Sequence, residues 1–371
     1  MRRPSMSERP ATIRDVARVA GVGTTTVSRV INDRPNVKPE TARRIEEAIK
    51  TLGFRPNRLA NSFRNRSLSM IGMVVPDPTP TVFSAIADSV DEFAEEHGMV
   101  VVTAKSRRDA RRERALVSAF VEKGADGILL VTDDDDHRYL EADLARGYPL
   151  VFVLDPPNGV EAPAVVGDDR GGAREATQHL LAHGHGRIGL VGSTAKPSTA
   201  ERVEGYKAAL AENGIAVDAN LIRTQPVSTD HGYTATRDLL SLPDPPTALF
   251  STNYPATMGV LKALREHPSP IGLVCYGEFE AATLLSPGVT VVTSDPHVIG
   301  QQAVQLLLDQ IGGNGPRAAR VTVPPYLVPR GSGELRRDQS SGPFVGSGDP
   351  DRVSHIESQL RSNALQEGLA D

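Results

Sequence analysis

Hydrophobic residues in the first 55 positions recur at helical spacing in three short segments. In residues 11–20 they stand at i, i+3, i+4 and i+7, which defines one face of a helix. A Gly-Val-Gly triplet interrupts this pattern, a second helix is predicted over about residues 24–32, and a third begins at Pro39 and ends before Gly53. The predicted inward positions are Ile13, Val16, Ala17, Ala20, Val27, Val30, Ile31, Ile45, Ala48, Ile49 and Leu52.

Three short helices with a tight glycine turn between the first two are typical of a helix-turn-helix unit. In that unit the second helix enters the major groove of DNA, and its N-terminal residues reach the base edges. Thr24 and Thr25 are therefore the predicted base-edge residues, and Arg29 can bind guanine through two hydrogen bonds. Thr26 and Ser28 fit phosphate contacts or packing. A plain three-helix bundle with surface threonines is the alternative.

The charge is divided unevenly along the 371-residue chain. Residues 1–66 contain 15 Lys and Arg against 6 Asp and Glu, whereas the remainder contains 26 against 40. A basic module on an acidic body indicates that the first segment alone meets a polyanion.

From residue 69 onward, short apolar runs alternate with amphipathic stretches. Repeated β-α units predict parallel sheets covered by helices on both faces, and two such sets predict two lobes with a ligand cleft at the carboxyl ends of the strands. The predicted fold class is thus α/β behind an all-α headpiece. Strands are expected at 69–75, 99–104, 127–131, 149–154, 187–191, 221–223, 247–251 and 271–275, and helices at 82–97, 109–123, 138–146, 171–183, 200–213, 231–240 and 256–266.

The stretch TIRDVARVAGVGTTTVSRVINDRPNVKPETARRIEEAIKTLGFRPNRLANSFRNRSLSMIGMVVPD closely resembles the headpiece of LacI/GalR-type repressors from about Thr12 to Pro76. The resemblance implies a DNA-binding headpiece over residues 1–55, with Asn32 also in the DNA-contact set. It implies a homodimer reading a near-palindromic, double-stranded operator. Gly23 and Lys38 depart from the family, which usually has Ser there, and Lys38 cannot cap a helix start.

Residues 56–67 resemble the hinge of that family, which folds on the operator and inserts an apolar side chain into the minor groove. Asn57, Leu59 and Ala60 match its pattern. Phe63 stands at the wedge position in place of the usual Leu, and both residues can unstack a base step. Arg64 is expected near phosphates. Off DNA, the hinge is expected to be unstructured.

Residues 71–331 resemble the effector domain of the same family, which has the periplasmic-binding-protein fold, through HLLAHGHGRIGLVG, ERVEGYKAAL and PTALFSTN. The effector-binding and dimerisation domain is placed at residues 68–333. The resemblance implies chain crossings near Gly167–Asp168, Thr293–Pro296 and Pro324–Tyr326. The implied N-lobe contains residues 68–167 and 296–324, and the implied C-lobe contains residues 168–293 and 326–333.

Position by position, the family's effector pocket maps onto four residues here. Phe83 stands where a residue packs on the ligand, and Asp155 ends a strand that faces the cleft. Arg202 normally binds hydroxyls or a carboxylate. Asn253 belongs to a family Asn-Asp pair, although its neighbour here is Tyr254.

The other pocket positions depart from the family. Gly277 replaces an acidic residue, Glu278 follows it, and Val227 stands where an aromatic residue is common. Arg202 keeps a fixed positive charge, so without an acidic partner the pocket favours an effector with a phosphate or carboxylate group. The alternative is that Arg202 is paired internally, with Asp155 or Glu278, and that the effector site is degenerate.

Other features carry less weight. His179, His183 and His185 are read as surface or capping residues, because a metal site needs a further defined ligand. Asp133–Asp136 lack the spacing of a calcium loop and are expected to form a solvated acidic loop. No nucleotide or hydrolase motif occurs at a strand-to-helix turn, so we expect neither an enzyme nor a bound cofactor.

Several features bear on location and assembly. A single cysteine, Cys275, fits a reducing compartment, and no signal or membrane-spanning segment is evident, which indicates a cytoplasmic protein with no membrane partner. The tail from residue 334 is expected to be flexible. Its stripe of Val353, Ile356 and Leu360 leaves a tetramer open, with disorder or a surface helix as the alternatives.

We therefore predict a DNA-binding transcriptional regulator, a repressor of metabolic genes, that is modulated by a sugar or anionic sugar derivative. The first rival is a regulator whose body does not respond to any effector. A solute-binding protein is a second rival, against which the basic headpiece argues. An enzyme is the third.

Overall fold

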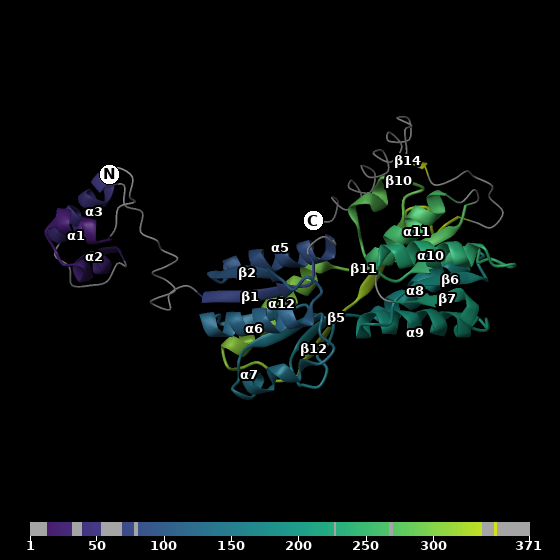
Figure 1. Ribbon diagram of the computed structural model, residues 1–371, viewed down its shortest axis with the longest axis horizontal. Coiled ribbons are helices and arrows are strands. Elements are labelled where there is room, and N and C mark those ends of the chain that lie inside the picture. Colours follow the sequence, from purple (N-terminus) through teal and green to yellow (C-terminus); the bar gives the residue numbers. More distant parts are fainter. Residues whose placement is uncertain are drawn as a thin grey trace, which may run out of the picture. The chain divides into compact units, whose positions relative to one another are not determined.

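A computed structural model describes residues 13–31, 39–52, 69–77, 81–225, 228–266, 270–335 and 345–346. The chain divides into two compact units, residues 1–68 and residues 69–371, and each is treated by itself (Figure 1). Among the helices that the structure describes, none is long and apolar enough to cross a lipid bilayer.

The first unit contains the three helices expected from the pattern. They are α1 (Ile13–Ala20), α2 (Thr24–Ile31) and α3 (Pro39–Leu52). Val16, Val27 and Ile45, one from each helix, are fully buried against one another. Gly21 adopts a φ of +65° in the tight turn between α1 and α2, a conformation that costs glycine little. The predicted helix-turn-helix unit is confirmed.

The N-lobe of the second unit is built on six described strands in the order β12-β5-β4-β3-β1-β2, all paired in parallel. The connections between them place helices on both faces, as parallel sheets require. The strands are β1 (Ser69–Val75), β2 (Met99–Lys105), β3 (Gly127–Leu130), β4 (Leu150–Leu154), β5 (Ala164–Gly167) and β12 (Arg320–Val323).

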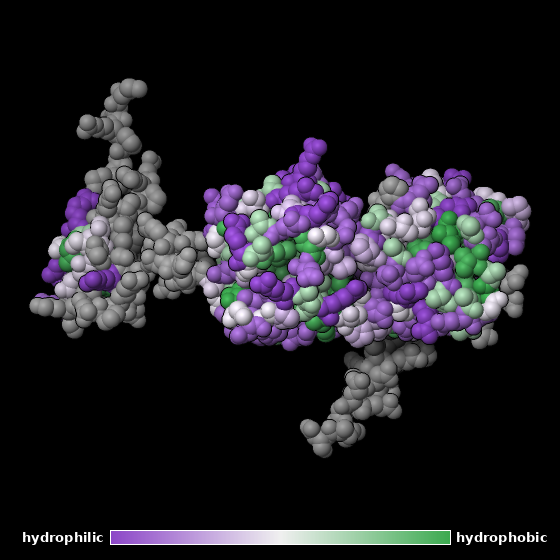
Figure 2. All heavy atoms as spheres, turned by 90° about the horizontal axis from the view of Figure 1, so that it is seen from below, coloured by the Kyte–Doolittle hydropathy of each residue, from purple (hydrophilic) through white to green (hydrophobic). Residues whose placement is uncertain are grey.

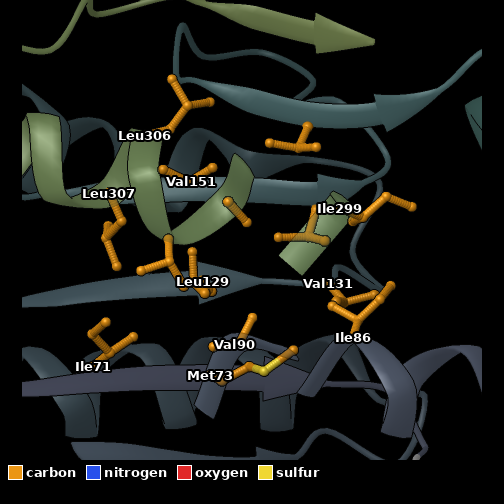
Figure 3. Packing of buried hydrophobic residues seen from close by; sticks show 14 of the residues in the cluster. Ile71, Met73, Ile86, Val90, Leu129, Val131, Val151, Ile299, Leu306 and Leu307 are labelled. Atoms are coloured by element: carbon orange, nitrogen blue, oxygen red, sulfur yellow. The ribbon is translucent and has the colours of Figure 1, made fainter. Parts of the chain in front are cut away.

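Alternate residues of β1 enter two separate cores. Ile71 and Met73 pack against α5 (Thr81–Glu96) and α12 (Pro296–Ile311), as Figure 3 shows. Met70 and Val74 point to the opposite face, toward α6 (Ala110–Lys123), the 3-10 helix η1 (His137–Leu140) and α7 (Glu141–Ala145). Burying one such side chain contributes about 1.5–3 kcal/mol, so both faces stabilise the lobe.

The C-lobe repeats this plan with six described strands in the order β13-β11-β9-β8-β6-β7, in which only the pairing of β11 with β13 is antiparallel. One face packs on α10 (Thr229–Leu240) and α11 (Tyr254–Arg265), and the other on α8 (Asp169–Ala182) and α9 (Pro197–Glu212). The strands are β6 (Ile188–Gly192), β7 (Ile222–Thr224), β8 (Ala248–Ser251), β9 (Gly272–Tyr276), β11 (Thr290–Ser294) and β13 (Pro325–Val328).

The chain passes between the two sheets at three described points. It leaves β5 for α8 after Gly167, leaves β11 for α12 after Ser294, and leaves β12 for β13 after Val323. Figure 1 shows β11 reaching from the C-lobe toward the N-lobe. These crossings place the carboxyl ends of the parallel strands of both sheets toward the space between the lobes. Figure 2 shows polar and hydrophobic residues mixed over the face of this unit in view.

Several elements differ from those expected. Residues 138–146, expected as one helix, form η1 and the short α7 instead. The pattern named no elements in residues 290–328, which form β11, α12, β12 and β13. The short helix η2 (Ala219–Leu221) precedes β7, η3 (Glu280–Thr283) follows β9, and β10 (Leu285–Ser286) pairs antiparallel with β14 (Val345–Gly346). The stripe expected in the tail lies outside the described residues.

Candidate functional site

The candidate DNA-binding surface is the exposed side of α2. Thr24, at its N-terminus, and Arg29, in its last turn, are exposed, whereas Thr26 is half-buried. Val27 is fully buried and anchors the helix to the rest of the unit. No acidic residue stands in the first turn of α2, so no carboxylate of that turn competes with a phosphate for the positive end of the helix dipole.

For the other residues that were predicted to contact DNA, the structure does not describe the side chain or the whole residue. Thr25 and Ser28 belong to α2, but their side chains are outside the described set. The remaining contacts, Asn32 and the whole predicted hinge, lie outside the described residues; the hinge residues concerned are Asn57, Leu59, Ala60, Phe63 and Arg64.

A cavity of about 200 Å³ lies between the two lobes of the second unit. Its walls come from the ends of strands and helices on both sides, including the N-terminal regions of α5, α9 and α11. The structure brings all six predicted effector residues to this cavity: Phe83, Asp155, Arg202, Asn253, Gly277 and Glu278.

Arg202 is held by Asp169, a residue that sequence reasoning missed. Its guanidinium contacts the Asp169 carboxylate at 2.8 Å through Nε and 2.7 Å through a terminal nitrogen, and donates to the Thr252 carbonyl at 2.7 Å. It also lies 3.7 Å above the ring of Tyr276. Burial raises the pKa of Asp169, and the Arg202 charge opposes that rise. The expected internal partners, Asp155 and Glu278, do not form this pair.

Close approach of two helices explains why Asp169 meets Arg202. Asp169 is the first residue of α8 and Arg202 lies in the second turn of α9. At Gly205, a Cβ atom would come within 2.2 Å of the Arg170 carbonyl oxygen, so glycine permits the two helices to pack closely. An acidic residue at a helix N-terminus is itself favourable, and that was the available sequence signal.

Asp155 joins the two lobes. Asp155 is 9% exposed, and its carboxylate accepts the backbone N–H of Ser198, near the N-terminus of α9, at 3.0 Å. The preceding Leu154 has a φ of +72°, a left-handed conformation that non-glycine residues rarely adopt. Such strain costs of order 1–3 kcal/mol and is found where a side chain must be aimed precisely.

Asn253 lines the cavity and carries a buried side-chain donor. Its Oδ1 accepts the Ala256 N–H at 3.0 Å and caps α11. Its Nδ2 is buried and has no hydrogen-bond partner among the described residues. A buried amide without a partner costs about 1–3 kcal/mol, so this group favours a ligand that brings an acceptor oxygen.

The surroundings of Gly277 and Glu278 differ from those that the sequence argument assumed for the charge of the effector pocket. Gly277 has a φ of +101°, which glycine tolerates, and Glu278 pairs with Arg330 at 2.5 and 3.0 Å. Because Asp169 already neutralises Arg202, the premise that Arg202 lacks an acidic partner was wrong, and the alternative of internal pairing holds with a partner that was not expected. Three cations and four acids line the cavity, namely Arg108, Lys196, Arg202, Asp133, Asp155, Asp169 and Glu278.

The segment Asp133–Asp136 is only partly the solvated loop that was expected. The side chains of Asp135 and Asp136 are 79% and 44% exposed, but that of Asp134 is 7% exposed and pairs with Arg114. Burial raises the pKa of Asp133, whose carboxylate accepts the Ser106 hydroxyl. The expectation holds for Asp135 and Asp136 and is wrong for Asp134, because a run of like charges does not reveal which of its members the fold covers.

The histidines have structural partners. His179 contacts Glu334 at 2.5 Å and His183 contacts the His179 carbonyl at 2.8 Å. His185 is buried between Thr247 and the Leu335 carbonyl, rather than at the surface. Within the described ranges, no group of three or more His, Cys, Asp or Glu side chains is placed to hold a metal ion.

Comparison with known proteins finds similarity along most of the chain. The model for bacterial regulatory proteins of the lacI family matches residues 12–57, and that for a periplasmic binding protein-like domain matches residues 177–333. The HTH-type transcriptional repressor PurR of Vibrio atlanticus (strain LGP32) is 31% identical over 307 residues, which are 81% of this chain and 92% of that protein.

Two solved structures extend this likeness to three dimensions. A complex of the transcriptional regulator CelR with cellobiose is 29% identical, with a TM-score of 0.65, over 87% of this chain and 100% of that chain. The Lac repressor dimer bound to operator and the anti-inducer ONPF is 25% identical, with a TM-score of 0.74, over 88% of this chain and 100% of that chain.

Proposed function

Because the chain belongs to the lacI family of bacterial regulatory proteins, we propose that it represses transcription from a near-palindromic operator and that a small metabolite bound between its lobes changes its operator affinity. It is a DNA-binding transcriptional regulator and not an enzyme. The observation that carries the regulatory part is the cavity between the lobes, beside the segments where the chain crosses. A cytoplasmic location is part of this proposal, because the operator DNA of a bacterium lies there.

The DNA contacts follow from α2. Thr24 and Thr25 stand at the end of the helix that reaches base edges, and Arg29 can bind guanine O6 and N7 together. Thr26, Ser28 and the residues of the hinge would contact phosphates and the minor groove. Phosphate contacts carry most of the affinity and make it dependent on salt.

The proposed effector is a compact compound rich in hydroxyl groups. A volume of about 200 Å³ is below the 300–1,000 Å³ that is usual for drug-sized ligands, and so fits a small sugar. Asn253 Nδ2 offers a donor, Asp155 an acceptor and Phe83 an apolar wall. The near balance of acids and cations favours a neutral compound. Arg108, which lines the cavity and is exposed, supports an anionic sugar derivative as the second candidate.

Coupling between cavity and DNA requires two states that the ligand binds unequally. The hydrogen bond from Ser198 to Asp155 crosses between the lobes and borders the cavity, so a ligand that contacts Asp155 would change the free energy of lobe closure. The closure would be passed to the headpieces through β1, which follows the hinge in sequence.

A homodimer would present two headpieces to a palindromic operator. The edge strand β2 exposes Val100 and Val102 by 38% and 40%. Exposed apolar residues on an unpaired sheet edge invite pairing with another chain. We place part of the dimer interface on this edge, and leave a tetramer formed through the tail as an alternative.

The rival reading is a regulator whose body binds no effector. One observation favours it, because Asp169, Thr252 and Tyr276 already satisfy much of the Arg202 guanidinium. Arg202 would then be a structural residue rather than a ligand contact.

Selection of bound DNA from a random pool tests the proposed operator binding. A palindromic sequence should emerge, and the affinity of the protein for it should fall steeply as salt is added. Thermal melting with a library of sugars, sugar acids and sugar phosphates tests the proposed effector binding. A ligand at 100 times its Kd should add about 2.7 kcal/mol of stability. If no compound in the library shifts the melting temperature, the rival reading is favoured; if no palindrome emerges, the repressor proposal fails.

A further inference from the structure

Lys196 is a C-lobe residue whose side chain ends on the N-lobe. It immediately precedes α9, and its ammonium group lies 2.7 Å from the Asp133 carbonyl oxygen and 3.4 Å from that of Asp134. It also lies 3.1 Å from the Asp135 carboxylate. An ammonium group has three N–H donors, so these three acceptors can satisfy it fully.

The loop that receives Lys196 is fixed by a buried carboxylate. Glu113 of α6 is fully buried and accepts the backbone N–H groups of Asp133 and Asp134 at 2.5 and 3.3 Å. It also accepts the hydroxyl groups of Thr132 and Tyr139, at 3.1 and 2.8 Å. With their N–H groups turned inward to Glu113, the two aspartates present carbonyl oxygens to the C-lobe. The receptor for Lys196 is therefore built by the N-lobe itself.

Lys196 also stands between two cavities. The effector cavity is on one side, and a second cavity of about 290 Å³ is on the other, with Thr132, Asp155 and Lys196 lining both. His137 and Asn158 of the N-lobe and Thr194 of the C-lobe line the second cavity. Because Lys196 of the C-lobe contacts the loop of the N-lobe, opening of the lobes would have to break this contact.

We propose that Lys196 is a latch that sets the free-energy difference between the closed and open arrangements of the lobes. Both sides of the latch belong to one chain. The latch borders the effector cavity, but it does not depend on which effector enters that cavity. The preference of a ligand for one arrangement of the lobes then adds to this fixed contact or opposes it. The strength of the contact therefore sets the ligand concentration that shifts the equilibrium between the two arrangements.

The chemistry of the contact requires an ammonium group. Methionine has a similar length but no donor, so it would leave the carbonyl groups of Asp133 and Asp134 without this partner. A charge-assisted hydrogen bond contributes enough for its loss to raise the open fraction about tenfold. The same helix offers a matched control, because Lys207 pairs with Glu204 on the exposed surface of α9, away from the N-lobe.

The test measures the distance between the lobes in the full chain. Spin labels at Ala119→Cys of α6 and Ala211→Cys of α9, both exposed positions, report it by electron paramagnetic resonance, and the native Cys275 is buried. Labelled chains are diluted into unlabelled protein so that only distances within one chain are read. Lys196→Met should add a population at longer distance, whereas Lys207→Met should leave the distribution unchanged.

A superimposable distribution in Lys196→Met and in the parent protein would overturn the latch. If Lys196→Met does not melt cooperatively, Lys196→Gln takes its place, since glutamine retains polarity at this half-buried position. Asp135→Asn removes the negative charge of one acceptor at an exposed site and should give a smaller shift in the same direction. The outcome is independent of operator binding, so failure of the latch and failure of the proposed function are distinguishable.

Discussion

The Arg202 guanidinium and the Asp169 carboxylate form a buried ion pair with contacts of 2.7 and 2.8 Å. The pair joins the start of α8 to α9 at the wall of the effector cavity. It changes the electrostatics expected from the sequence, because the charge of Arg202 is compensated by Asp169. The pair also fixes the position from which Arg202 could meet a ligand.

Replacing Asp169 with Asn should destabilise the second unit, because it leaves the Arg202 charge buried without its partner. Breaking such a pair costs about 3–5 kcal/mol, measured as the free energy of unfolding in urea. The control is Glu212→Gln, whose pair with Arg174 is exposed and should contribute under about 1 kcal/mol. Equal losses in the two variants would contradict the buried role of Asp169.

Replacing Asn253 with Ser separates helix capping from ligand binding. Serine also caps helices, so the free energy of unfolding should change by less than about 1 kcal/mol. The Nδ2 donor is lost, so the rise in melting temperature caused by an effector found in the library should disappear. An undiminished ligand response in Asn253→Ser would show that the buried amide does not face the ligand.

Replacing Arg29 with Ala should relax the preference for one base pair in each half-site. A bidentate contact to guanine gives about 1–3 kcal/mol of discrimination, measured by competition between operator variants. Lys50→Ala, at an exposed position of α3, is the control and should leave base preference unchanged. Uniform weakening of Arg29→Ala on all sequences would assign Arg29 to a phosphate instead.

Acidification should destabilise the fold through His137. Burial lowers the pKa of His137 below its usual 6.5, and its Nδ1 accepts the Asn158 N–H at 2.8 Å, which a protonated ring could not do. As the pH drops through 6.5, His137 becomes protonated in the unfolded chain while it stays neutral in the folded chain. The free energy of unfolding therefore falls as the pH drops. The excess stability of the parent over His137→Gln should shrink between pH 7 and pH 5; a constant difference would exclude this cause.

Dimerisation should depend on β2. A charge at Val102 would be buried in the proposed interface, so Val102→Asp should move the protein toward monomers in sedimentation experiments. Val217 is similarly exposed, at 42%, and lies in the C-lobe away from β2, so Val217→Asp serves as the control. A dimer unchanged in Val102→Asp would remove this edge from the interface.

The sequence by itself determined the headpiece and the alternation of strands and helices. Val16, Val27 and Ile45 each belong to a separate run of apolar residues at helical spacing, and that local period is enough to define three helices and their inner faces. The central strands of the two sheets are buried on both faces and appear as continuous apolar runs, which short-range patterns also reveal. The family resemblance also assigned six residues to one pocket, and all six line the cavity.

The tertiary structure alone decided which charges meet. Asp169 and Arg202 are 33 residues apart, and Lys196 is more than 60 residues from the loop that receives it. Whether Asp134 is buried or exposed depends on Glu113 and Arg114, which reach it from another element. Periodicity reports the side of an element that faces inward, whereas the partner of a charge is set by helix packing and lobe contacts that no local spacing encodes.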